Sequence, residues 1–341
     1  MVEFRLDMLA ALSKGARRAP NLFRGLHTKV CIIGSGPGAH SAAIYASRGA
    51  LEPILVEGKV SNFPPPGGQL TTTIDVENYA GFPDSVGGFQ LMQLMKQQSE
   101  KFGTKILTEE VESVDFTKPP YKLKTEQSDI SADSVIIATG AVARRLDFIG
   151  ADEYWNRGIS ACATCDGALP MFRDENIVVV GGGDSAMEEA LFLTKFAKQV
   201  FVVHRRDELR ASQIMQRRAR SNPKITFILS HVVKSAVGDG KRLSSLVIKS
   251  TKVGNEESVL ETKGLFFAVG HVPATKFLQG SGLALDKDGY VITFNSQTAT
   301  NLPGVFACGD VADRVYRQAI TAAGTGCMAA LDAERYLENS G

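Results

Sequence analysis

The sequence predicts an α/β fold with two Rossmann-like units, the second inserted into the first. Two similar segments carry this prediction: residues 29–39 read KVCIIGSGPGA, and residues 176–186 read NIVVVGGGDSA. In each, an apolar run suited to a buried parallel strand precedes a glycine-rich turn and then small and apolar residues at helical spacing. Another apolar run follows each unit, at residues 53–56 and 200–203. Two strand–helix–strand units of this kind imply two parallel sheets.

The remaining strands and the last helix follow from shorter patterns. A proline turn at 118–120 separates two runs that we expect to pair as antiparallel strands. The tail holds a strand and a helix but no glycine-rich start of its own, so it is expected to complete the first unit. The predicted units are therefore residues 28–144 with 273–341, and residues 145–272 as the insertion. The predicted strands are 111–116, 121–125, 134–138, 264–269 and 305–307, and the final helix is 317–337.

Length and composition exclude several classes of protein. At 341 residues the chain exceeds one typical core, and its 44% hydrophobic and 22% charged residues are typical of soluble globular proteins. The net charge of +1 gives no electrostatic case for nucleic acid or an anionic membrane as partner. No apolar stretch approaches the roughly 18 residues of a membrane span. Five cysteines, an odd and small number, argue against an extracellular disulfide framework.

The first 27 residues are expected to form a separate basic extension. Between residues 8 and 27 the chain carries four Lys or Arg residues and no acid, among scattered Leu, Phe and Ala. That composition is typical of a mitochondrial transit peptide and favours a mitochondrial location. Glu3 and Asp7 weaken this interpretation. The alternative is that the basic extension carries no targeting signal and that the protein is cytoplasmic.

The first glycine turn has the spacing of a dinucleotide fingerprint. Gly34 allows the tight turn, Gly36 lets the backbone approach a pyrophosphate, and the small Ala39 lets the helix pack on the strand. The helix N-terminus then offers free N–H groups to phosphate. Glu57 ends the next strand, 23 residues beyond Gly34, and an acid there suits the two ribose hydroxyls of FAD or NAD. The alternative is a tight turn without a ligand.

The second unit differs at the end of the strand that follows its glycine turn, where the first unit has the acid expected to bind the ribose. In place of an acid the chain has Arg205 and Arg206, whose guanidinium groups bind phosphate bidentately, whereas an acid would repel a ribose 2′-phosphate. This favours NADP over NAD, and hence FAD in the first unit and NADPH in the second. The alternative is a solvated basic helix start. The positions assigned to the NADPH site are Gly181, Gly183, Asp184, Ser185, Ala186, His204, Arg205, Arg206 and Arg210.

Cys162 and Cys165 form a Cys-x-x-Cys pair 16 residues before the second fingerprint. Such a pair can be half of a zinc site, a redox disulfide or a coincidence. Zinc normally needs four ligands, and the chain has no second Cys-x-x-Cys or His pair. A redox pair needs close thiols and a proton donor nearby. Asp166 is a candidate general acid for that chemistry.

In the order of these motifs the chain resembles the low-molecular-weight thioredoxin reductases of bacteria, fungi and plants. The resemblance spans about residues 29–337 and departs only slightly, with Gly38 and Cys308 where alanine is more usual. The motifs that carry it are GSGPGA, GGQL from Gly67, EN from Glu77, ATG from Ala138, CATCDG, GGGDSA, HRRDELRAS, GHVP from Gly270, GDV from Gly309 and RQAITAAGTG from Arg317.

The resemblance implies a thioredoxin-disulfide reductase that passes electrons from NADPH to FAD, then to the cysteine pair, then to thioredoxin. It implies that Cys165 is the thiol nearer the flavin, that Cys162 attacks the partner disulfide, and that Asp166 is the acid. It also implies a homodimer and an inserted domain that swings between two orientations. The FAD site that it implies comprises Gly34, Ser35, Gly36, Pro37, Gly38, Ala39, Glu57, Gly68, Gln69, Asn78, Val111, Thr139, Gly140, Cys165, Gly309, Asp310, Arg317, Gln318 and Ala319.

Two rival functions remain open. A flavin-dependent dithiol oxidase would keep the cysteine pair but would not need a reader of the 2′-phosphate, so Arg205 and Arg206 count against it. An NADP-binding redox sensor would not need the full set of residues that this chain retains, namely both cysteines, Asp166 and every flavin contact.

Overall fold

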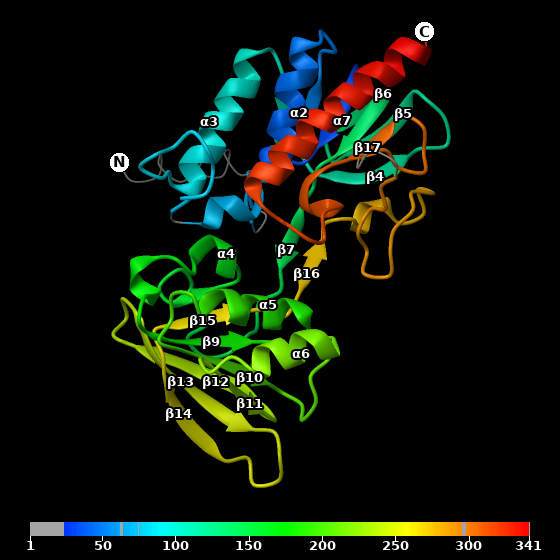
Figure 1. Ribbon diagram of the computed structural model, residues 1–341. Helices are drawn as coiled ribbons and strands as arrows, with labels where there is room; N and C mark the ends of the chain where they lie inside the picture. Colours follow the sequence, from blue (N-terminus) through cyan, green and yellow to red (C-terminus); the bar gives the residue numbers. More distant parts are fainter. Residues whose placement is uncertain (1–23, 62–63, 74, 295–297, 341) are drawn as a thin grey trace, which may run out of the picture.

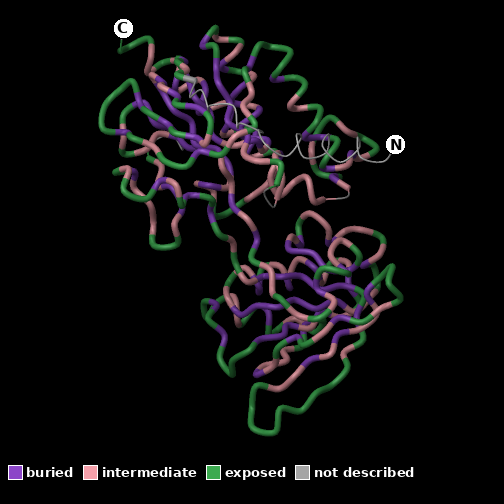
Figure 2. Tube along the Cα trace, turned by 180° about the vertical axis from the view of Figure 1, so that it is seen from behind, coloured by how far each residue is buried: buried purple, intermediate pink, exposed green. Residues whose placement is uncertain are grey.

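The computed structural model describes residues 24–61, 64–73, 75–294 and 298–340. The chain forms two lobes joined by a narrow pair of strands (Figure 1). Figure 2 shows buried residues along the strands inside each lobe and exposed residues in the loops around them. The predicted transit peptide falls mostly on residues 1–23, outside the described residues. No helix in the described ranges is long and apolar enough to cross a bilayer.

The first lobe is built on a seven-stranded sheet of order β3-β2-β1-β6-β5-β4, with β17 also paired to β6. The strands β1, β2, β3, β6 and β17 run parallel, whereas β4, β5 and β6 pair antiparallel. This confirms the predicted strand pair around the proline turn. The strands are β1 (Arg24–Ile33), β2 (Ile54–Val56), β3 (Lys105–Leu107), β4 (Val111–Asp115), β5 (Tyr121–Thr125), β6 (Ser128–Ile137) and β17 (Val305–Ala307).

Three helices cover this sheet: α2 (Pro37–Arg48), α3 (Gly88–Lys101) and α7 (Ala319–Ser340). Figure 1 shows α2 and α7 side by side, and small buried residues let them approach closely. A Cβ added at Gly326 of α7 would lie 2.1 Å from the carbonyl oxygen of Gly38 in α2. The two helices therefore pack backbone against backbone above the sheet.

Strand β1 begins at Arg24, five residues before the predicted apolar run and within the predicted extension. Its first half alternates, with Leu26 and Thr28 turned toward the core and His27 exposed. Such a half-buried strand shows a period of two and not a continuous apolar run. Residues 24–28 pair in register with β6, from Arg24 opposite Ser128 onward.

The second lobe holds a five-stranded parallel sheet of order β11-β10-β9-β15-β8. A separate antiparallel sheet, β12-β13-β14, packs beside it. The strands are β8 (Ile159–Ser160), β9 (Asn176–Val180), β10 (Gln199–His204), β11 (Ile225–Leu229), β12 (His231–Gly238), β13 (Leu243–Ser250), β14 (Glu257–Glu261) and β15 (Gly264–Phe267), and the helices are α4 (Ala163–Asp166), α5 (Asp184–Leu193) and α6 (Gln213–Arg220).

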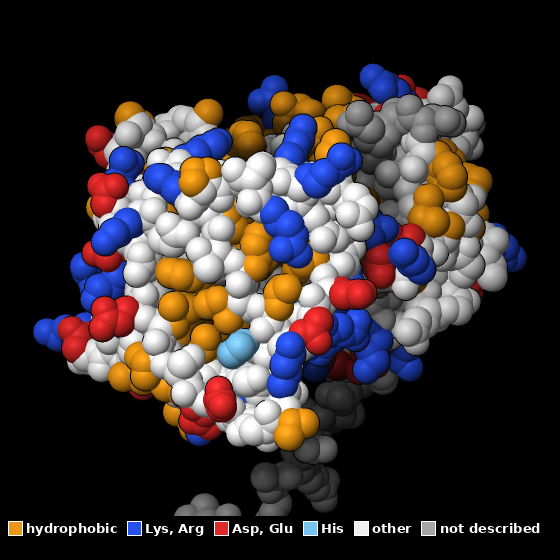
Figure 3. Space-filling view, turned by 60° about the horizontal axis from the view of Figure 1, so that its bottom comes forward, with side chains coloured by type: hydrophobic (Ala, Val, Ile, Leu, Met, Phe, Trp, Pro, Cys, Tyr) orange, Lys and Arg blue, Asp and Glu red, His pale blue; other side chains and the backbone are white. Residues whose placement is uncertain are grey.

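Acidic and basic side chains are interspersed on the end of this lobe that Figure 3 brings forward.

Two antiparallel strands, β7 (Ala141–Ala143) and β16 (His271–Pro273), carry the chain out to this lobe and back. Gly140 (φ +70°) precedes β7 and Gly270 (φ +94°) precedes β16. Short 3-10 turns complete the fold: η1 (Gly68–Thr72), η2 (Pro170–Phe172), η3 (Lys276–Leu278) and η4 (Gly309–Val311).

Candidate active site

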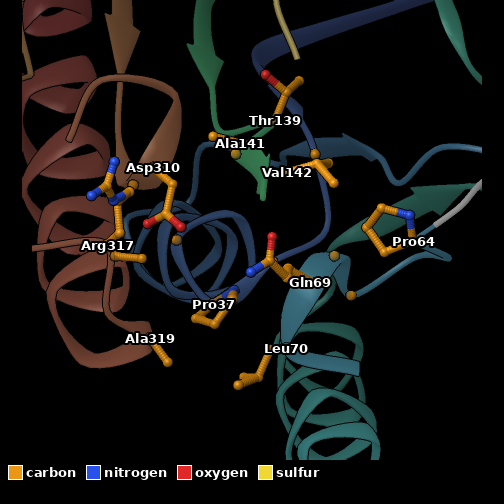
Figure 4. A pocket seen from close by; sticks show the side chains of 18 of the residues that line it. Pro37, Pro64, Gln69, Leu70, Thr139, Ala141, Val142, Asp310, Arg317 and Ala319 are labelled. Atoms are coloured by element: carbon orange, nitrogen blue, oxygen red, sulfur yellow. The ribbon is translucent and has the colours of Figure 1, made fainter. Parts of the chain in front are cut away.

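A cavity of about 790 Å³ opens between the two lobes. The first glycine turn, η1, η4 and the approach to α7 line it from the first lobe, and the cysteine turn and α5 line it from the second. Figure 4 shows Pro37, Gln69 and Asp310 arranged around this space, with Arg317 beside Asp310. Residues far apart in the sequence therefore converge on one site.

The first glycine turn is shaped to hold a phosphate. Gly34 has φ +124°, and a Cβ there would lie 2.2 Å from the carbonyl oxygen of Ala138, so only glycine fits. Gly36 caps α2 without a side-chain hydrogen bond to the first turn, and Gly36, Pro37 and Gly38 line the cavity. A helix N-terminus in this state attracts anions. The turn has the features required of a pyrophosphate site.

Glu57 is held rigidly at the edge of the cavity. Lys96 Nζ donates to its two carboxylate oxygens at 2.9 and 2.8 Å, and Thr108 Oγ1 donates at 2.6 Å. Ser35 Oγ donates to the Glu57 carbonyl at 2.8 Å and accepts from the Gly67 N–H at 2.9 Å. The acid predicted for ribose binding is therefore fixed by α3 and by the glycine turn together.

The two active-site sulfurs are joined in a disulfide, with Cα atoms 5.3 Å apart. Cys162 caps the short helix α4, and its Sγ accepts from the Cys165 N–H at 3.2 Å. In the described residues no three His, Cys, Asp or Glu side chains cluster as a metal site. The disulfide agrees with the redox interpretation of the pair.

The cysteine turn is docked against the first lobe through Gln318. Gln318 Nε2 donates to Thr164 Oγ1, between the cysteines, at 3.3 Å. Its Oε1 accepts from Asn78 Nδ2 at 3.3 Å. This chain of side chains places the disulfide in the cavity.

Asp166 lies just outside the cavity lining. Its Oδ2 accepts from Ser160 Oγ at 2.5 Å, and Ser160 Oγ in turn accepts from the Cys162 N–H at 3.1 Å. Burial raises the pKa of Asp166, and the hydrogen bond from Ser160 opposes that rise.

Other buried groups in the cavity have strongly shifted pKa values. Burial raises the pKa of Asp310 to about 7 and that of Glu189 to about 8, and it lowers the pKa of His271 to about 4. Glu189 Oε2 and His271 Nδ1 are buried without a hydrogen-bond partner among the described residues. Unpaired polar atoms beside a glycine turn fit a cavity made for a polar ligand.

The predicted FAD residues converge on this cavity. All of them line it except Ala39, which is fully buried between helix and sheet. The disulfide that they surround belongs to the other lobe. This agrees with the sequence, in which the cysteine pair falls within the predicted insertion and the other FAD residues fall outside it.

The predicted NADPH residues do not share the cavity, apart from Ser185. Arg205, Arg206 and Arg210 are exposed on the second lobe. The Arg210 N–H donates to the Gly182 carbonyl at 2.7 Å, which ties the basic loop to the glycine turn. His204 is buried and its ring packs against that turn, so closely that a Cβ added at Gly182 would lie 2.4 Å from it.

Sequence reasoning missed several residues of the site. Lys96 and Glu189 lie on helical faces with no recognisable motif, and their partners are distant in sequence. His271 appeared only within a motif, without a role. Phe277 also lines the cavity, and nothing in its local pattern signals this. The run Pro64–Pro66 lines it as well, next to the predicted flavin residues that begin at Gly67.

The comparisons with known proteins agree on one family. A model described as pyridine nucleotide-disulphide oxidoreductase matches residues 28–326. The chain is 56% identical to thioredoxin reductase 1, mitochondrial, of Arabidopsis thaliana, over 99% of this chain and 92% of that protein. It is 54% identical to thioredoxin reductase 1 of Saccharomyces cerevisiae, over 92% of this chain and 98% of that protein.

Solved structures are similar over the same span. Thioredoxin reductase from Giardia duodenalis matches with a TM-score of 0.87 at 42% identity, covering 92% of this chain and 99% of that one. Thioredoxin reductase of Lactococcus lactis in its FR conformation matches with a TM-score of 0.60 at 39% identity and the same coverage. The chain therefore belongs to the pyridine nucleotide-disulphide oxidoreductases and, within them, to the low-molecular-weight thioredoxin reductases.

Proposed function

We propose that this protein uses NADPH to reduce the disulfide of a thioredoxin, through bound FAD and its own Cys162–Cys165 pair. The observation that carries the proposal is the position of that disulfide, in the cavity lined by the first glycine turn. A disulfide that merely stabilised the fold would have no reason to face a dinucleotide site.

FAD is proposed to occupy the first lobe. The α2 N-terminus would hold the pyrophosphate, Glu57 the adenosine ribose, and Gln69, Asp310 and the residues before α7 the flavin end. When bound there, FAD supplies the step that accepts a hydride and passes two electrons to a disulfide. The residues of this chain position it and exclude water.

NADPH is proposed to bind the second lobe, at the turn from Gly181 to Ala186. Arg205 and Arg206 follow β10 where the ribose 2′-phosphate would lie, and both are exposed and ready to bind it. These two residues also argue against a dithiol oxidase, which has no need of NADPH.

A change in lobe orientation is part of the proposal. In the arrangement seen here the disulfide faces the cavity and the basic loop lies outside it, so NADPH cannot reach a flavin without movement. The Giardia and Lactococcus enzymes support this. They are similarly close in sequence, at 42% and 39%, yet their TM-scores are 0.87 and 0.60. A different placement of the lobes in the Lactococcus structure would account for that drop.

The proposed domain limits follow from the same arrangement. We assign residues 28–144 and 273–341 to the FAD domain and 145–272 to the NADPH domain. The crossing strands β7 and β16 support these limits, with Gly140 and Gly270 as hinge points.

The two cysteines are assigned different tasks. Cys165 would exchange electrons with the flavin, Cys162 would attack the thioredoxin disulfide, and Asp166 would protonate the departing thiolate. Asp166 suits this role because it lies next to Cys165 in the chain and burial raises its pKa.

The proposal extends to assembly and location. We expect a homodimer, and exposed Tyr45, Phe89 and Phe102 on or beside α2 and α3 offer apolar surface for it. We expect a mitochondrial location from the basic extension, which the name of the Arabidopsis relative supports.

The decisive experiment compares NADPH-dependent reduction of thioredoxin, glutathione disulfide and peroxide by the purified protein. Thioredoxin should be reduced and the other two should not. The protein should be yellow and bleach with NADPH. Cys162→Ser should abolish thioredoxin reduction while flavin bleaching persists, and a colourless protein would refute the proposal.

A further inference from the structure

Glu189 is a buried carboxyl to which the mechanism above gives no role. It lies on α5 and lines the cavity together with Cys162 and Cys165. Its Oε2 atom is buried and has no hydrogen-bond partner among the described residues. A buried polar atom without a partner destabilises the fold, because it has given up its hydrogen bonds to water. A group kept at such a cost next to a reactive pair points to a use in the chemistry.

A backbone contact places this carboxyl beside the cysteine turn. The backbone N–H of Ala163, the residue after Cys162, lies close enough to the Glu189 carboxyl to lower its pKa. Helix α4, which carries the turn, packs directly on α5. Glu189 therefore lies beside Ala163, which is one residue from Cys162 and two residues from Cys165 in the chain.

The charges around Glu189 set its protonation. Arg317, at the approach to α7, faces it from the first lobe, and Glu188 is its charged neighbour on α5. Burial raises the pKa of Glu189 to about 8, with Arg317 and the Ala163 N–H opposing the rise and Glu188 adding to it. At neutral pH the side chain is thus a carboxylic acid with a proton to give.

We propose that Glu189 supplies a proton when the Cys162–Cys165 disulfide is reduced inside the cavity. This rests on the proposed function. Reduction of a disulfide to two thiols takes two electrons and two protons, whereas the hydride taken from NADPH carries two electrons and one proton. The S–S bond breaks as both sulfurs are reduced. One sulfur ends with the proton of the hydride, and the other takes the proton of Glu189.

The carboxylate left on Glu189 then lies opposite Arg317, which stabilises it across the lobe boundary. Solvent returns the proton when the cavity opens. Proton supply inside the cavity is thereby separated from the exchange with the partner disulfide, for which Asp166 remains the acid.

The other buried acids and bases are less suited to the task. His271, with its pKa lowered to about 4, is neutral and holds no imidazolium proton. Asp166 is bonded to Ser160 and does not line the cavity. Asp310 does line it, but belongs to the first lobe, beside Arg317, among the residues assigned to the cofactor (Figure 4).

The test uses rapid mixing of the flavin-loaded enzyme with NADPH, without oxygen, followed by acid quenching and counting of thiols. Glu189→Gln should leave the bleaching of the flavin unchanged and slow thiol formation at pH 7 by about a hundredfold, as for loss of a general acid. The wild-type rate should fall as pH rises through about 8, and Glu189→Gln should lack that fall. Glu189→Asp, which keeps an acid, should recover part of the rate. Wild-type rates and pH profile in Glu189→Gln would overturn the proposal.

A second readout does not depend on turnover. The infrared difference spectrum between wild type and Glu189→Gln should show a protonated-carboxyl band at pH 7 that disappears above about pH 8. Glu188→Gln should keep the band and move its midpoint slightly lower, because Glu188 raises the pKa of Glu189. An ionised Glu189 at pH 7 would contradict the inference. If NADPH fails to bleach the wild type, the proposed function fails, and the infrared titration still decides the state of Glu189.

Discussion

Lys96, on α3 and 39 residues after Glu57 in the chain, donates hydrogen bonds to both carboxylate oxygens of Glu57. The Glu57 side chain is only 3% exposed, so its charge has little water to stabilise it. Removing one partner of such a pair leaves the other charge buried and uncompensated. Lys96 is therefore expected to keep Glu57 ionised and oriented for a ribose.

Lys96→Met should weaken FAD binding by about 10- to 100-fold, which corresponds to the loss of about 1.5–3 kcal/mol for a hydrogen bond to a charged group. Lys96→Arg should retain most of the affinity. The measurement is FAD titration of the apoprotein, followed by protein fluorescence. In a Glu57→Gln background Lys96→Met should have little further effect. An equal loss in both backgrounds would show that Lys96 acts on folding and not through Glu57.

Arg205 and Arg206 are exposed, so their value lies in binding and not in stability. Replacing both with Ala should weaken NADPH binding at least about tenfold, since each charge-assisted hydrogen bond contributes about 1.5–3 kcal/mol. NADH binding should change little, because NADH lacks the 2′-phosphate. Kinetic constants for both nucleotides check this, with Arg217→Ala on α6 as the control for loss of surface charge. If the double variant loses NADH and NADPH equally, the assignment of the phosphate reader is wrong.

At this scale the sequence predicts residues that stand at fixed offsets from a glycine turn, and those that belong to a contiguous motif. Glu57 and the cysteine pair are of this kind. Lys96 and Glu189 are not, because their partners come together only through helix packing. The raised pKa of Glu189 likewise depends on burial between two lobes, which no local pattern encodes.

Among the elements, α7 departs from its predicted start for a local reason. The Asp313 carboxylate accepts the N–H groups of Val315, Tyr316 and Arg317, and Arg317 takes φ +48°. This turn ends in a left-handed residue, so the helix begins at Ala319 and not at Arg317. The turn also places Arg317 and Gln318 against the cavity.

The β12–β14 sheet was not predicted, and its irregularities explain why. The pairing of β12 with β13 shifts register between Val233 and Ser235, and again between Val237 and Gly238. Each shift changes which residues face the core, so the alternation that marks a strand loses its phase. Helix α3 was not predicted either, because its buried face is narrow, with Leu91 and Met92 among glutamines.

Two glycines of α7 give a matched test of its packing on α2. Gly326→Ala would place a methyl group 2.1 Å from the Gly38 carbonyl oxygen, so the helices must separate, at a cost of about 1–3 kcal/mol. Gly324→Ala meets no atom within 4 Å and should stabilise by about 0.4–1 kcal/mol. Urea unfolding measures both. If Gly326→Ala is no less stable than Gly324→Ala, the close approach of α2 and α7 is not a constraint.

For the whole molecule, two nearly independent cores are linked by β7 and β16, and a few polar contacts hold the lobes in the orientation seen here. Besides Gln318 with Thr164, Asn156 Nδ2 donates to the Thr72 carbonyl across the gap. Contacts of this size, about 0.5–1.5 kcal/mol each, are readily exchanged for others. The sequence indicated two units with their cofactor fingerprints, but the orientation between them depends on such weak contacts and could not be predicted.

A covalent link across the gap should therefore trap one half of the proposed cycle. Thr72→Cys with Asn156→Cys, in a Cys327→Ser background, can be joined by a short bismaleimide while Cys162 and Cys165 are protected in their disulfide. The linked enzyme should keep its flavin but lose NADPH-dependent bleaching, because the NADPH loop cannot turn toward the cavity. Each single-cysteine variant, treated in the same way, should bleach normally. Because the linked disulfide still faces the flavin, electrons supplied to the flavin by photoreduction should continue to appear as thiols at Cys162 and Cys165. Bleaching by NADPH at an undiminished rate in the linked enzyme would mean that hydride transfer needs no movement of the lobes.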